Sequence, residues 1–113
     1  MKLLIVVLNN PDLVSEVVPV LVELDVRRIV SLETETMLHF LAREVPIFAG
    51  IRELVTSPRA YTKTLFGITE SENILSELDN FLKDINIDLT GSGDGYALTI
   101  PMDGLIEGDE DQP

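Results

Sequence analysis

The segment LLIVVL, residues 3–8, is apolar at six consecutive positions. A short apolar run bounded by turn residues is typical of a strand, and a strand without polar positions is buried on both faces, as in the middle of a sheet. The run is too short for the apolar core of a signal peptide, and no small-residue cleavage site follows it. We therefore expect a central strand here, and other elements must cover its two faces.

Two amphipathic helices are predicted to cover one of these faces. Asn10 and Pro11 form a helix start, and apolar residues then recur every three or four positions over residues 14–24. Thr69 and Glu72 have the spacing of a capping box, and a second apolar stripe follows them. Its members are Ile74, Leu75, Leu78, Phe81, Leu82 and Ile85.

Further strands are predicted at about residues 28–32, 61–68 and 96–100. The resulting order is typical of an α+β protein with a ferredoxin-like βαββαβ fold, in which a four-stranded antiparallel sheet carries two helices on one face. Because two helices cover one face only, the second face of the central strand must be covered by another part of the chain or by another subunit. We therefore expect a homo-oligomer whose sheets face inward, most simply a homotrimer.

The segment between the second and third strands, residues 36–59, is too long for an ordinary hairpin and is therefore a candidate functional insert. It is rich in apolar residues, and from Pro46 onward their spacing is helical, with the proline well placed at the start. We expect a packed helical insert between strands two and three.

Charge and composition exclude several classes of function. The chain has 20 acidic and 8 basic residues and a net charge of −12, which opposes binding to nucleic acid or to an anionic membrane. No apolar run approaches the roughly 20 residues that cross a bilayer, so membrane insertion is not expected. The absence of cysteine excludes disulfides and is compatible with a cytoplasmic location. His39 is the single histidine, which favours a structural role over a metal site, and no enzyme is predicted.

A glycine-rich segment, LTGSGDGYALTIP at residues 89–101, leads into the last strand. Backbone amides at glycines can converge on an anion, so Gly91, Gly93, Asp94 and Gly95 are candidates for a phosphate-binding loop. The segment is not a Walker motif, because no Gly-Lys-Ser/Thr follows and the next element is a strand. A plain helix-to-strand turn accounts for the same residues, and the pattern alone leaves both readings open.

The same segment resembles the P-II nitrogen-regulatory proteins, and so does the start of the chain. The resemblance covers residues 1–106 and leaves residues 107–113 as an acidic tail, whose charge run predicts disorder. The matching residues are Pro11, Val14, Val26-Arg27-Arg28, Thr90-Gly91, Gly93-Asp94-Gly95, Ile100-Pro101 and Asp103.

The resemblance implies a signal-transduction protein, a trimer of ferredoxin-like subunits that binds ATP, ADP or another adenine nucleotide in clefts between subunits. It implies that Gly91, Gly93, Asp94 and Gly95 wrap the phosphates, and that residues 36–59 bind a regulated partner protein. The sequence departs from the family pattern in two places. Tyr96 stands where the family has a lysine, and Glu107 begins an acidic run where the family has arginines, so charge-assisted bonds to a triphosphate are lost.

Two alternatives use the same architecture. One is a metal-binding trimer similar to the divalent-cation-tolerance proteins, in which carboxylates rather than the glycine loop bind the ligand. The other is a structural interaction module that docks a partner through its apolar insert and binds no ligand.

Overall fold

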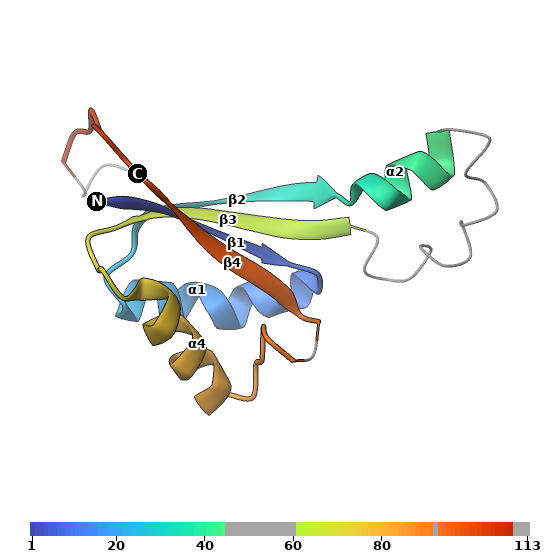
Figure 1. Cartoon of the computed structure of the whole chain (residues 1–113), viewed down its shortest axis with the longest axis horizontal. Helices are drawn as coiled ribbons and strands as arrows, with labels where there is room; N and C mark the ends of the chain where they lie inside the picture. The colour runs from blue at the N-terminus through green and yellow to red at the C-terminus, as the bar shows by residue number, and fades with distance from the viewer. Residues whose placement is uncertain (45–60, 92, 110–113) are drawn as a thin grey trace.

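The computed structural model describes residues 1–44, 61–91 and 93–109 of the 113-residue chain. These residues form an α+β fold in which two helices, α1 and α4, lie on one face of a four-stranded antiparallel sheet (Figure 1). The arrangement is compatible with the expected ferredoxin-like fold. The elements are β1 (Lys2–Leu8), α1 (Val14–Glu23), β2 (Arg27–Glu35), α2 (Met37–Glu44), β3 (Tyr61–Thr69), α4 (Ile74–Asp84) and β4 (Gly95–Pro101).

The strand β1 lies inside the sheet, between β3 and β4, as its apolar sequence predicts. Its side chains alternate between the two faces. Leu4, Val6 and Leu8 are buried under the helices, whereas the odd-numbered residues between them lie on the other face and are only half-buried. A single chain therefore covers one face of β1 completely and leaves the second face, expected to be buried as well, partly open.

The first helix begins where the sequence predicts. Asn10 Oδ1 accepts a hydrogen bond from the Asp12 amide at 3.0 Å, and one 3₁₀ turn, Pro11–Leu13, leads into α1. Pro19 lies inside α1 on its exposed side, so the missing hydrogen bond falls where water can replace it. The core side of the helix is therefore uninterrupted.

The second helix begins differently from the prediction. Thr69 Oγ1 accepts a hydrogen bond from the Ser71 amide at 3.1 Å, and Ser71 Oγ accepts one from the Asn73 amide at 3.2 Å. Glu72 lies instead near Lys2, with Oε2 3.7 Å from Nζ. The predicted capping box of Thr69 and Glu72 is wrong, because the Thr69 hydroxyl bonds to the Ser71 amide and the helix starts only after Asn73.

Strand β2 is longer than predicted, because Glu33, Thr34 and Glu35 continue the ladder opposite Lys63, Thr62 and Tyr61 of β3. Helix α2 follows at the far end of β2, within the segment expected to hold a helical insert (Figure 1). The helix predicted from Pro46 falls in residues 45–60, outside the described residues. Across the described ranges, no helix is both long enough and apolar enough to cross a membrane.

The packing of α4 gives a direct stability test. Leu78 is 1% exposed, and we expect Leu78→Ala to lower the free energy of unfolding by about 2–5 kcal/mol, since it removes buried methyl groups and leaves a cavity. Leu75 on the same helix is 41% exposed, and Leu75→Ala should cost less than about 1 kcal/mol. Urea unfolding of the two variants measures the difference. Equal losses would contradict the burial described here.

Candidate functional site

The glycine segment connects α4 to β4 and lies beside the end of β1. Gly95 opens β4 opposite Leu8, and Asp94 immediately precedes it. The Asn9 amide donates a hydrogen bond to the Asp94 carbonyl at 2.8 Å, and Asn9 Nδ2 donates to the Gly93 carbonyl at 2.9 Å. Asn9 therefore fixes the second half of the glycine segment against the end of β1.

The first half of the segment is organised around Asp88. Its Oδ1 accepts hydrogen bonds from the Thr90 amide at 2.9 Å, the Thr90 hydroxyl at 2.6 Å and the Gly91 amide at 3.1 Å. A side chain at position 91 has little room, since an added Cβ would lie 2.7 Å from Asp88 Oδ2. The Gly91 amide of the predicted phosphate loop and the neighbouring Thr90 amide thus already hold an anion, and that anion is a carboxylate of the chain itself.

These hydrogen bonds change the acidity of Asp88. The Thr90 hydroxyl, then the Thr90 amide and with a smaller effect the Gly91 amide, lower the pKa of Asp88 below its ordinary value. Partial burial opposes this shift, and the charge of Lys83 reinforces it. The ionised form of Asp88 is therefore the form that fits the loop.

The backbone at Gly93 and Gly95 explains why glycine occupies both positions. Gly93 has φ of 73°, in the left-handed region that side chains rarely adopt. Gly95 has φ of 153°, and a Cβ there would lie 1.9 Å from the Val7 carbonyl oxygen. Close contact between β4 and β1 requires glycine at position 95, with or without a ligand.

One cavity adjoins the glycine segment on the face of the sheet away from the helices. It has a volume of about 330 Å³, and we call it the sheet-face cavity. Its wall includes a hydroxyl cluster in which Thr34 Oγ1 lies 3.0 Å from Thr64 Oγ1 and also hydrogen-bonds Thr62 Oγ1. The lining residues are Val7, Asn9, Thr34, Glu35, Thr36, Met37, Thr62, Thr64 and Tyr96.

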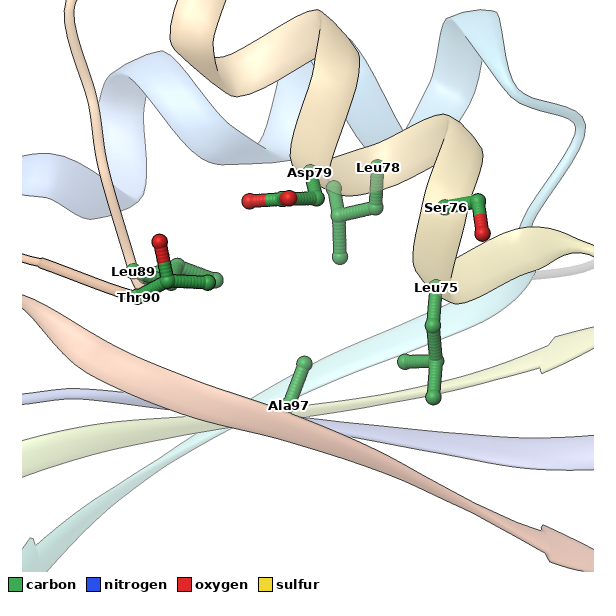
Figure 2. A pocket seen from close by; sticks show the side chains of 7 residues that line it. All are labelled: Leu75, Ser76, Leu78, Asp79, Leu89, Thr90 and Ala97. Carbon is green, nitrogen blue, oxygen red and sulfur yellow. The ribbon is translucent and has the colours of Figure 1, made fainter.

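A second cavity, of about 290 Å³, lies on the helix side, between α4 and β4; we call it the α4 cavity. Figure 2 shows Leu75, Leu78 and Ala97 around its apolar side, with Asp79 and Thr90 on the side of the loop. Ser76 and Leu89 complete the lining. Asp79 Oδ2 lies 3.0 Å from Lys83 Nζ one helical turn away, and this bond raises the pKa of Lys83.

The two cavities are similar in charge. Among the described residues that line them, the charged groups are Glu35 in the sheet-face cavity and Asp79 in the α4 cavity, and neither lining includes a lysine or arginine. A ligand with several negative charges would meet a carboxylate in either place. The polar atoms that remain are hydroxyls and amides, which suit a neutral or weakly charged ligand.

The structure places the four predicted site residues together in one segment but gives them different surroundings. Gly91 faces Asp88, Gly93 and Asp94 are bonded through their carbonyls to Asn9, and Gly95 lies in the sheet. Sequence reasoning missed Asp88 and Asn9. Asp88 stands two residues before Thr90-Gly91, and an aspartate at that spacing is a turn signal that could have indicated its role in the loop. The bond from Asn9 joins residues 84 apart in sequence and left no local signal.

Metal ligation is not supported by any grouping of side chains in the part of the chain that the structure describes. There, no three histidine, aspartate or glutamate side chains come together in a way that could hold an ion. His39 lies on α2, and its side chain falls outside what the structure describes. Comparison of the sequence with protein-family models gives no match, and comparison with curated proteins gives none either.

The lowered pKa of Asp88 predicts a pH-dependent effect of its charge on stability. Because the folded value lies below the ordinary 3.8, ionised Asp88 stabilises the fold above pH 3.8, and this contribution disappears as the pH falls through the folded value. We expect Asp88→Asn to melt at a lower temperature than the wild type at pH 7, with a smaller difference at pH 3.

Thermal melting followed by circular dichroism at the two pH values measures this difference. Asp103→Asn, at an exposed position outside the loop, serves as the control for simply removing one negative charge. A stability difference for Asp88→Asn that is unchanged between pH 7 and pH 3 would show that its charge does not matter.

Proposed function

We propose that this protein is a P-II-like regulatory protein that assembles as a trimer and binds a small ligand between its subunits. The observation that carries the proposal is an uncovered apolar sheet face with a polar cavity at its edge. The strand order β2-β3-β1-β4, with both packed helices on the other face, supports the ferredoxin-like assignment that the resemblance implies. Signalling, the trimer and the nucleotide are expectations of that resemblance.

The uncovered face, which we call the open face, extends over all four strands. Val30 on β2 is 55% exposed and Tyr96 on β4 is 56% exposed, although both are paired with apolar residues, Phe66 and Val7. Large continuous apolar patches are rare on monomers and typical of subunit interfaces. Ile68 on this face is already buried, at 8% exposed. The other apolar members of the open face are Leu3, Ile5, Val7, Val30, Leu32, Phe66, Tyr96, Leu98 and Ile100.

The sheet-face cavity shares Val7 and Tyr96 with the open face. A subunit packed on the open face would therefore lie next to the cavity and close part of it. Binding at such a boundary couples ligand occupancy to assembly, because the site is complete only when the neighbouring subunit is present. This position supports a ligand site between subunits.

The chemistry of the cavity favours a nucleotide with few phosphates. Tyr96 offers an aromatic ring and the threonine cluster offers hydroxyls, whereas Glu35 is the charged group among the described lining residues. The Thr90 and Gly91 amides are already bonded to Asp88. These two amides are not among the residues that line the sheet-face cavity, and its described lining offers no lysine or arginine to a phosphate chain. A cyclic nucleotide, which carries one negative charge, is therefore a better fit than ADP or ATP.

A bound ligand would influence a partner protein through the conformation of the insert. Thr36 and Met37 line the sheet-face cavity and stand at the start of the segment expected to bind a partner, residues 36–59. A ligand that prefers one arrangement of these two residues shifts the population of insert conformations by its difference in affinity. A regulated protein that binds one of those conformations would then respond to the ligand.

A second candidate is the interaction module without a ligand. Met37 and Phe40 are exposed on α2, as expected for a surface that docks another protein. For the divalent-cation alternative, no grouping of described residues supplies a comparable observation. The module and the regulatory protein share the trimer and differ in nucleotide binding.

The assembly is tested by charged substitutions on the open face. We expect the wild type to elute with three times the mass of one chain in size-exclusion chromatography with light scattering. Leu98→Glu should yield monomers, because a carboxylate buried in the interface is strongly unfavourable. Val22→Glu on α1, also at an exposed position, should remain trimeric. A monomeric wild type would refute the assembly.

The ligand is tested by calorimetry with ATP, ADP and cyclic AMP. We expect binding, weakest for ATP, and we expect Tyr96→Ala to reduce affinity by about tenfold, since an aromatic contact is worth roughly 0.5–1.5 kcal/mol. Tyr61→Ala, an exposed tyrosine of β3 outside the cavity, should bind as the wild type does. If no nucleotide gives heat while the trimer persists, the interaction module is the better description.

A further inference from the structure

A charged site lies at the opposite end of the sheet from the glycine segment, where β2 begins (Figure 1). Arg27 Nη1 donates a hydrogen bond to Glu107 Oε1 at 2.6 Å, and Arg28 Nε donates to Glu107 Oε2 at 3.1 Å. Arg28 Nη2 also donates to the backbone carbonyls of Gly108 at 2.7 Å and Asp109 at 3.2 Å. Two guanidinium groups therefore hold four oxygens of one three-residue segment, Glu107–Asp109, which we call the acidic segment.

The backbone at this point explains how neighbouring arginines reach the same carboxylate. In a regular strand, consecutive side chains point to opposite faces. Here the pairing of β2 with β3 is irregular between Arg27 and Val30, and Arg28 has φ of 57°, in the left-handed region. Non-glycine residues adopt this conformation at a cost in free energy, and such strain is concentrated at functional sites.

The acidic segment is held by polar contacts rather than by packing. Ile106, just before it, is fully exposed, and Leu105 is exposed as well. A Cβ added at Gly108 would meet no atom within 4 Å. The side chains of Arg27, Arg28 and Glu107 are 24%, 29% and 26% exposed, so solvent and small ions still reach these contacts and another anion can replace them.

We propose that Arg27 and Arg28 form a binding site for a small, multiply charged oxyanion, a phosphate or a polycarboxylate, and that the acidic segment occupies this site in the free protein. Guanidinium groups recognise both kinds of oxyanion through paired hydrogen bonds, and Glu107 already shows the bridging geometry. An oxyanion with more charge than one carboxylate forms stronger bonds to the same two groups and releases the segment.

Two features keep the site suitable for an external anion. Arg27 Nη2 also lies 3.3 Å from Glu70 Oε1, so Arg27 stays oriented when the segment leaves. The net charge of −12 repels anions at a distance, but ions screen charges beyond about 8 Å at physiological salt, so an anion at the site responds mainly to the two arginines and to the carboxylates beside them, Glu70 and Glu107. The inference rests on neither the trimer nor the nucleotide of the proposed function.

Calorimetric titration of pyrophosphate, and separately of citrate, into the full chain tests the site. We expect Glu107→Gln to bind the preferred anion about fivefold more tightly than the wild type, the factor that corresponds to an ion-pair contribution of about 1 kcal/mol. Glu72→Gln, which removes an exposed carboxylate paired with Lys2 instead, should bind as the wild type does. Tighter binding of pyrophosphate would identify a phosphate ligand, and tighter binding of citrate a polycarboxylate.

Arg28→Gly removes one guanidinium group and should preserve the fold, since glycine adopts the left-handed backbone at this position readily. We expect it to lose anion binding, and we expect the Gly108 amide resonance of the wild type to shift on titration as the acidic segment leaves. Equal affinity of Glu107→Gln and wild type would overturn the proposal. Unchanged binding by Arg28→Gly, or no binding of either anion to wild type and Glu107→Gln, would also overturn it.

Discussion

The structure depends on the burial of β1, a strand that is apolar on both faces. Both packed helices lie on one side of the sheet, so Leu4, Val6 and Leu8 are covered. The other face carries neither of these helices and stays partly exposed. The open face, the position of the sheet-face cavity and the proposed assembly are consequences of this one imbalance. A second subunit would complete the burial that the sequence of β1 demands, and it would do so next to the glycine segment.

Internal carboxylates occupy the donor groups that an anionic ligand would use. Asp88 accepts from the Thr90 and Gly91 amides at one end of the sheet, and Glu107 bridges Arg27 and Arg28 at the other. In a chain with 20 acidic and 8 basic residues, such pairing within the chain is favourable. Any external anion must therefore compete with a tethered one, so its affinity reflects the difference between two similar interactions.

Local sequence signals predicted much of the fold. The apolar run of β1, the stripe of α4 and the turn at Asn10 all appear in the structure, because each depends on neighbours in sequence. The capping box failed, since the Ser71 amide bonds to the Thr69 hydroxyl that the box would have used for the Glu72 amide. The glycines of the candidate site could be recognised in the sequence. Asn9 in that site, and Glu107 at the other end of the sheet, contact residues about 80 positions away, and no local sequence pattern indicates such contacts.

The close approach of Gly95 to Val7 has a consequence for the whole of β4. Tyr96 and Ala97 are consecutive, and the pleat directs one toward the sheet-face cavity and the other toward the α4 cavity. A slip of β4 by one residue would exchange the two faces and put a side chain where only a hydrogen fits beside the Val7 carbonyl. Gly95 therefore sets the register of the strand, and through the register it decides which cavity receives the aromatic ring.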